Sequence, residues 1–168
     1  MHTTHDIHFG WKPLEKAAFG LIYGAIMVLS LIMALGDTPD APFEPAMVLF
    51  GSVLAVTLAK AFSELLSHGI ETGERILSRR ALLTAWQHSH PTLLVANVPT
   101  ALFLAVGLGW LTTDAATALS QVFCVAILVM LGARFGWVVS RGAWLPVAGA
   151  LFAGGVGSAL ALLKYAIH

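Results

Sequence analysis

Ionisable side chains recur in the first half of the chain at intervals of three or four residues. They are, in order, Lys60, Glu64, His68, Glu71, Arg75 and Arg79. Because a helix turns by 100° per residue, these positions share one helix face, within an arc of roughly 100°. A carboxylate one turn from an ammonium group can exchange a proton or bind a small cation, and the ammonium tunes its pKa. The spacing therefore predicts a polar stripe on one helix.

The stripe begins directly after the second of five long apolar runs, which cover residues 17–36, 45–59, 91–113, 115–133 and 142–163. A helix needs about 20 apolar residues to cross a hydrocarbon core of about 30 Å. The second run reaches that length only when Lys60 and Glu64 are included. The runs have no polar face for water, so a soluble helical core is excluded. The composition agrees, since 11% of residues are charged, against about 25% in soluble domains.

We therefore predict an all-α fold, a helical transmembrane bundle of five spans in a single transmembrane domain, residues 17–168. A cytosolic tail, residues 1–16, precedes it. The predicted spans cover about residues 17–36, 46–67, 91–112, 115–138 and 143–165. The partner of most of the polypeptide is then the lipid bilayer, and we expect no nucleic-acid partner.

Basic residues indicate the orientation of the spans. Seven fall on one side of the predicted membrane: Lys12, Lys16, Arg75, Arg79, Arg80, Arg134 and Arg141. Lys164 lies alone on the other side, where the connecting segments carry acids instead. Cytoplasmic segments carry the excess of Lys and Arg in membrane proteins. The N-terminus is therefore predicted to be cytosolic and the C-terminus outside.

The first run has an alternative interpretation as a cleaved signal peptide. Lys12 and Lys16 would form its basic region, and the small residues Ala34 and Gly36 would mark the cleavage site. The run is longer than the usual apolar region of about 7–15 residues. We therefore predict an intact first span.

Two interpretations of the charged stripe stay open. In the first, Glu64 carries a proton or binds an ion, Lys60 tunes it, and Asn97 and Arg134 complete a cytosolic vestibule. His68, close to Glu64 and Glu71, is then a candidate pH sensor. In the second, Lys60 and Glu64 pair and lean toward the headgroups, because a lysine below the surface can snorkel. Asn97 then only caps a carbonyl freed by the nearby Pro99, and Arg134 reaches lipid phosphate.

The fifth run carries small residues at every fourth position. One series is Gly149, Ala153, Gly157 and Ala161, and a second is Ala150, Gly154 and Ser158. Small residues at this spacing let helix backbones approach closely in a membrane. The pattern predicts tight packing, either against another span of the chain or against a second copy in a homo-oligomer.

Several classes of site have no signature in the sequence. We find no H-E-x-x-H, G-x-S-x-G or P-loop motif, and no histidine at the middle of a span where it could ligate haem. Cys124 is the single cysteine, so it has no internal disulfide partner. His2, His5 and His8 could bind a metal loosely on a helix, but a solvated tail is the expectation. We therefore predict no enzyme activity, no cofactor and no metal.

The stretch Leu58-Ala59-Lys60-Ala61-Phe62-Ser63-Glu64, together with Tyr23-Gly24, resembles the first two spans of small uncharacterised bacterial polytopic integral-membrane proteins. The resemblance covers about the first third of the chain, and Lys60 stands where that pattern has a histidine. It implies a multi-pass protein of a bacterial inner (plasma) membrane and brings no known activity.

Two functions remain as hypotheses. The first is a small transporter or channel for protons or small ions, built on Glu64 and Lys60. The second is a non-transporting accessory or scaffold subunit, bound to another membrane protein, in which the charges only orient the chain.

Overall fold

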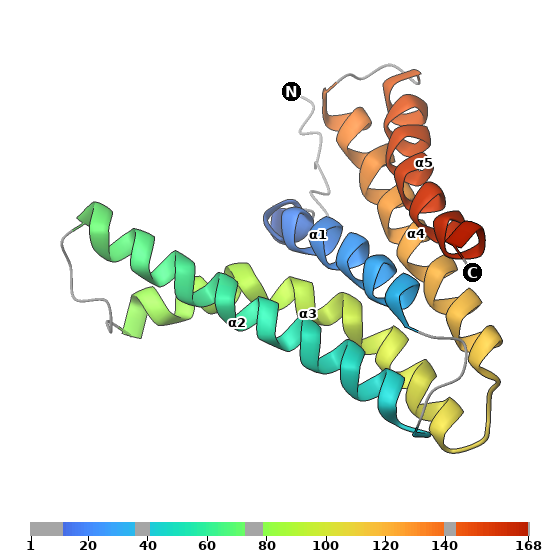
Figure 1. Cartoon of the computed structure of the whole chain (residues 1–168). Helices are drawn as coiled ribbons and strands as arrows, with labels where there is room; N and C mark the ends of the chain where they lie inside the picture. Colours follow the sequence, from blue (N-terminus) through green and yellow to red (C-terminus); the bar gives the residue numbers. More distant parts are fainter. Residues whose placement is uncertain (1–11, 36–40, 73–78, 140–143, 168) are drawn as a thin grey trace, which may run out of the picture.

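The computed structural model describes residues 12–35, 41–72, 79–139 and 144–167. These residues form five helices and no strand (Figure 1). The helices are α1 (Lys12–Ala34), α2 (Glu44–Thr72), α3 (Arg79–Gly107), α4 (Thr113–Val139) and α5 (Trp144–Ile167). Each is long and apolar enough to cross a membrane. The prediction of an all-helical fold with five candidate spans is confirmed, whereas the direction in which the spans cross stays a prediction.

The helices are arranged as two hairpins with α1 between them (Figure 1). α2 packs against α3, and α4 packs against α5, while α1 contacts all four. Within the described residues α2 packs against neither α4 nor α5. The two hairpins approach each other where α3 leads into α4. They diverge toward the C-terminal ends of α2 and α4 (Figure 1). The end where they diverge is the predicted cytosolic end.

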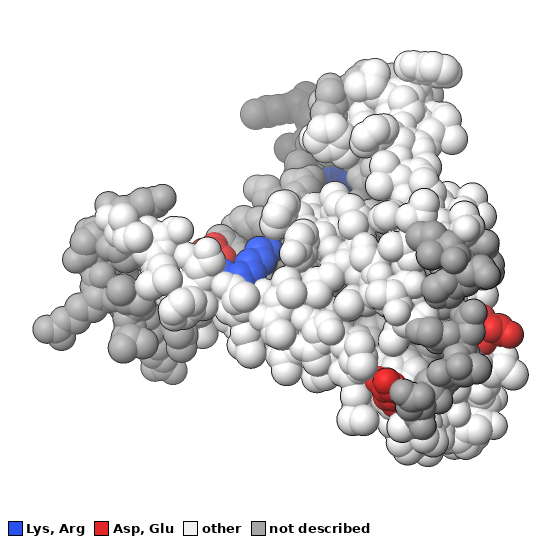
Figure 2. Space-filling view, in the orientation of Figure 1, with Lys and Arg blue, Asp and Glu red and all other residues white. Residues whose placement is uncertain are grey.

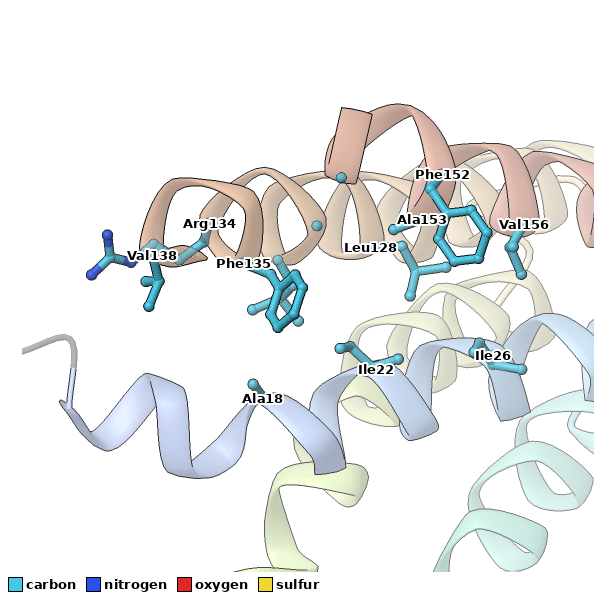
Figure 3. Close-up of a pocket in the computed structure, with 13 residues that line it drawn as sticks. Ala18, Ile22, Ile26, Leu128, Arg134, Phe135, Val138, Phe152, Ala153 and Val156 are labelled. Atoms are coloured by element: carbon cyan, nitrogen blue, oxygen red, sulfur yellow. The ribbon is translucent and has the colours of Figure 1, made fainter. Parts of the chain in front are cut away.

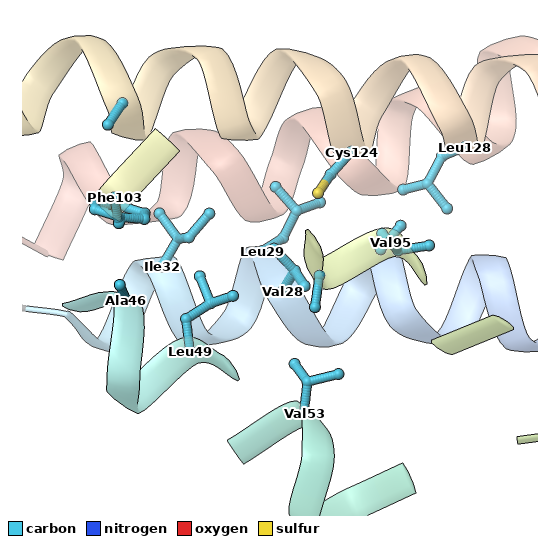
Figure 4. Close-up of a cluster of buried hydrophobic side chains, with 13 residues drawn as sticks. Val28, Leu29, Ile32, Ala46, Leu49, Val53, Val95, Phe103, Cys124 and Leu128 are labelled. Carbon is cyan, nitrogen blue, oxygen red and sulfur yellow. The ribbon is translucent and has the colours of Figure 1, made fainter. Parts of the chain in front are cut away.

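The buried apolar core lies in the half of the bundle where the hairpins converge. Its side chains include Leu29 and Ile32 of α1, Leu49 of α2, Phe103 of α3 and Leu128 of α4, all at most 2% exposed (Figure 4). Beyond Thr57 no described side chain of α2 is fully buried. This half of the bundle is therefore closed by packed apolar groups, and the other half is more open.

Helices α4 and α5 pack closely because glycines allow their backbones to come into contact. A Cβ atom on Gly149 or Gly136 would overlap backbone atoms of the facing helix. A Cβ on Gly132 would overlap Gly149 and lie 2.7 Å from the Cβ of Ala153. Because lipid competes equally well for apolar side chains, association in a membrane depends on such close packing.

The small-residue series of the fifth run is thus found between two helices of the same chain. Gly157 lies against Leu128 and Val125, and Gly154 lies against Val129. At the far end the side-chain amide of Gln121 donates to the carbonyl oxygen of Ala161 across 3.5 Å. A homo-oligomer through the fifth span stays a prediction.

Helix α3 ends before the third apolar run of the sequence does. α3 ends at Gly107, and Gly109 follows with a φ of +76°. The Trp110 amide donates to the Ala105 carbonyl and the Gly109 amide to the Val106 carbonyl, which together form a Schellman cap. Glycine adopts this left-handed conformation without the steric cost of a Cβ.

The helices on either side of the second connection are longer than the predicted spans. α2 runs through Gly69 to Thr72, so Gly69 does not end the helix, while Gly73 lies outside the described residues. α3 begins at Arg79 rather than near Pro91, and both Pro91 and Pro99 lie within it. Charged and polar residues thus extend both helices beyond their apolar segments.

Candidate functional site

Lys60 and Glu64 lie on α2 just beyond Thr57, the last fully buried residue among the described side chains of that helix. Both side chains are half-buried, and they are one helical turn apart on the same face. The Lys60 Nζ atom lies 4.5 Å from the centre of the Phe19 ring on α1. Phe19 in turn stacks on Tyr23, with ring centres 6.1 Å apart. The ammonium group is therefore held at the junction of α1 and α2.

The contact with Phe19 helps to offset the cost of placing a lysine at this depth. Cation–π contacts contribute about 0.5–1 kcal/mol at exposed sites and about 2 kcal/mol when desolvated. A lysine at mid-bilayer costs about 2.5–3.5 kcal/mol on insertion scales. The contact with Phe19 therefore offsets part of the cost of a partly buried Lys60.

Polar groups continue inward from this junction. Gly20, the residue after Phe19, packs against Pro91 and Thr92 of α3, and a Cβ on Gly20 would lie 3.4 Å from the Thr92 hydroxyl oxygen. Thr92 and Ser89 are fully buried, and their hydroxyls have no hydrogen-bond partner in the described part of the chain. Buried hydroxyls are normally satisfied, so each orphan needs an explanation. Water or a bound ion would supply the missing partner.

A further buried hydroxyl, on α2, forms a hydrogen bond within its own helix. Thr57 of α2 is fully buried, and its Oγ1 donates to the Val53 carbonyl oxygen at 2.8 Å. The hydroxyls of Ser89 and Thr92 lack such a bond, as do two further hydroxyls elsewhere in the described part of the chain, those of Thr100 and Ser120.

The remaining predicted site residues lie apart from this junction. Asn97 is exposed on α3, and the Arg134 side chain is half-buried on α4. Since α2 and α4 do not pack against each other in the described ranges, Arg134 belongs to a different helix contact from Lys60. His68 lies on α2, but its side chain is outside the described residues. The structure brings together Lys60 and Glu64 with α1, and the four-residue vestibule stays a prediction.

Charged side chains are sparse on the surface that can be seen (Figure 2). A basic and an acidic side chain lie next to each other there, and most of the other described atoms in this view belong to uncharged residues. Among the described residues, no three His, Cys, Asp or Glu side chains come close enough to hold a metal ion. The N-terminal histidines His2, His5 and His8 lie outside these ranges.

Sequence reasoning missed the groups that other helices bring to the junction. Phe19 of α1 and Thr92 of α3 are ordinary residues of apolar runs, and nothing in their local sequence marks them. The pair Gly20 and Gly24, four residues apart, is a sequence feature that could have indicated a close helix contact here. A Cβ on Gly24 would lie 2.9 Å from the Thr92 carbonyl oxygen, so this pair allows α1 to pack closely on α3.

No protein-family model, curated protein or solved structure matches this chain.

Proposed function

We propose that this protein is a small multi-pass protein of a bacterial inner membrane that moves protons or small cations, with Glu64 as the carrier or ligand and Lys60 as its tuning charge. The observation that carries the proposal is the position of this pair. Lys60 is held against Phe19 of α1, just beyond the last fully buried described side chain of α2, and the nearby Thr92 hydroxyl of α3 has no hydrogen-bond partner in the described part of the chain. An ionisable residue inside a membrane span is a candidate for ion or proton transfer by default.

The shape of the bundle supports the same proposal. The Glu64 side chain is half-buried at the predicted cytosolic end of the bundle, and the apolar core, with Leu49 and Val53 of α2, would block passage to the outer side. Alternating access requires a site that opens to one side while the other is closed. In this proposal the Thr92 hydroxyl, which lies close to Gly20 of α1, is the next polar group that an ion or proton meets.

We expect Glu64→Gln to abolish proton or cation flux, since an amide of the same size neither ionises nor binds a proton at neutral pH. The measurement is flux into liposomes that contain the pure protein, driven by a potassium diffusion potential. Glu44→Gln is the matched control, because Glu44 lies at the opposite end of α2, where its Oε2 accepts from the Ala41 amide at 3.3 Å. The control should keep the wild-type flux.

Two further variants separate a transport site from a structural ion pair. Lys60→Met removes the charge but keeps the length of the side chain, and it should change the flux. Thr92→Val keeps the shape of the side chain and removes the hydroxyl, and it should lower flux. If wild-type liposomes show no flux, or if all variants match wild type at equal folded yield, the transport proposal fails.

A second candidate is a non-transporting accessory subunit. Two observations favour it: Asn97 is exposed, and α2 does not pack against α4 among the described residues. The helices that carry the predicted vestibule residues Lys60 and Arg134 are therefore not in contact with each other. In that case Lys60 and Glu64 only fix the position of α2 at the membrane surface. Folded yield would fall in Glu64→Gln because one partner of an ion pair is removed, and no flux would be found.

A further inference from the structure

A groove of about 720 Å³ lies between α1, α4 and α5, on the side of α1 away from α2 (Figure 3). Its walls are apolar, with Ile22 and Ile26 of α1 facing Leu128 and Phe135 of α4, and Phe152 of α5 at the far end. Among the described residues that line it, Arg134 alone is charged. The volume is within the range of about 300–1,000 Å³ for ligand sites in proteins.

The length of the groove matches one leaflet of a bilayer. On α4 its lining runs from Leu128 to Val138, which corresponds to about 15 Å at 1.5 Å per residue. Half of a hydrocarbon core of about 30 Å has the same length. A single acyl chain that enters from the predicted cytosolic leaflet would therefore reach the end of the groove.

Arg134 is at the correct end of the groove to meet a headgroup. Its guanidinium group extends along α4 toward the Val138 end, and Ala18 of α1 lines the same end (Figure 3). An arginine has five N–H donors in a fork that suits phosphate oxygens, so it can bind a phosphate in addition to a partner within the chain. The groove therefore presents apolar walls to a chain and a cation to a phosphate.

The sequence adds further positive charge at this end. Lys12 and Lys16 belong to the first turns of α1, the helix whose residue Ala18 lines this end, and the same turns carry one acid, Glu15. Basic pockets between helices on the cytoplasmic side bind anionic lipid headgroups. We propose that the groove between α1, α4 and α5 binds one anionic phospholipid, with an acyl chain along Ile22 and Leu128 and its phosphate on Arg134. This proposal does not depend on ion transport.

The test is lipid binding to the full-length protein, measured by native mass spectrometry from detergent micelles. The probes are dioleoyl phosphatidylglycerol and dioleoyl phosphatidylcholine, which share their chains and differ in headgroup charge. Wild type should bind the anionic lipid at least about fivefold more tightly, as one basic contact near the membrane surface predicts. Arg134→Gln should remove that preference and leave chain-dependent binding, whereas Arg134→Lys should retain much of it.

A second pair of variants tests the groove itself. Ala18→Phe places a ring in the groove and should weaken the binding of both lipids. Ala55→Phe is the matched control, because Ala55 is exposed on α2, away from the groove, and this variant should bind as wild type does. Equal binding of the two lipids by wild type would overturn the proposal, as would unchanged binding by Ala18→Phe. A dimer that Ala18→Phe alone dissociates would assign the groove to a second copy of the chain, and this result too would overturn it.

Discussion

Gly132→Leu is expected to separate α4 from α5 and to lower the free energy of unfolding by about 3 kcal/mol or more. At Gly132 even a Cβ atom would overlap the backbone of Gly149 and approach the Cβ of Ala153 to 2.7 Å. Backbone atoms cannot move aside as a flexible side chain can, so the helices themselves must shift. Each contact along the α4–α5 interface would then lose dispersion energy, and lipid would fill the gap.

The control for this prediction is on the facing helix. A Cβ on Gly155 of α5 would meet nothing within 4 Å, so Gly155→Ala should be neutral, or stabilising by about 0.5–1 kcal/mol through helix propensity. Both variants can be compared by unfolding in mixed micelles of increasing SDS content. A Gly132→Leu protein that unfolds at the wild-type SDS fraction would contradict the α4–α5 packing described above.

Phe103→Ala is the second variant with a large expected effect, a loss of about 3 kcal/mol of unfolding free energy. Phe103 is 1% exposed and packs within the core formed by α1, α2, α3 and α4. Removal of its ring leaves a cavity, because the four helices can collapse only in part. The cost comes from lost packing contacts, since lipid would solvate an unfolded phenylalanine about as well as the core does.

Phe62→Ala is the matched control because Phe62 is 61% exposed on α2. If lipid surrounds that ring, its removal leaves no cavity and should change the unfolding free energy by less than about 0.5 kcal/mol. The same SDS titration serves as the measurement. Equal losses for Phe62→Ala and Phe103→Ala would mean that the buried core is not where the structure has it.

The number and type of the helices could be predicted from the sequence, because in lipid only a helix satisfies its backbone within one segment. The helix boundaries were harder to predict from the sequence. The apolar run that contains Phe103 continues past the end of α3, and the helix stops at Gly107 because Gly109 adopts a positive φ. Hydropathy carries no information about that turn, whereas the glycine does.

The candidate site was predictable only where it depends on a single helix. Lys60 and Glu64 share a face because of their spacing, and any helix would place them so. Phe19 and Thr92 reach the same level through the packing of α1 against α2 and α3, which depends on tertiary structure. Arg134 could be recognised as a headgroup ligand, but the groove beside it exists only once α1, α4 and α5 are assembled.

The small residues of the fifth run illustrate the same limit. Their spacing predicts close packing, and the structure has Gly149 against Gly132 of the same chain. Sequence spacing describes one surface and is the same whether the partner is a neighbouring helix or a second copy. Only the short connection between α4 and α5 favours the former, since it brings antiparallel neighbours together.

The central claim is that lipid surrounds these five helices and that the basic connections face the cytosol. It is tested most directly by single-cysteine labelling in intact cells, in a Cys124→Ala background that removes the native thiol. Thr38→Cys, in the connection before α2, should react with a membrane-impermeant maleimide added outside. Ser140→Cys, in the connection before α5, should react only after the membrane is opened. Labelling of Ser140→Cys in intact cells, or recovery of the protein in the soluble fraction, would contradict the account.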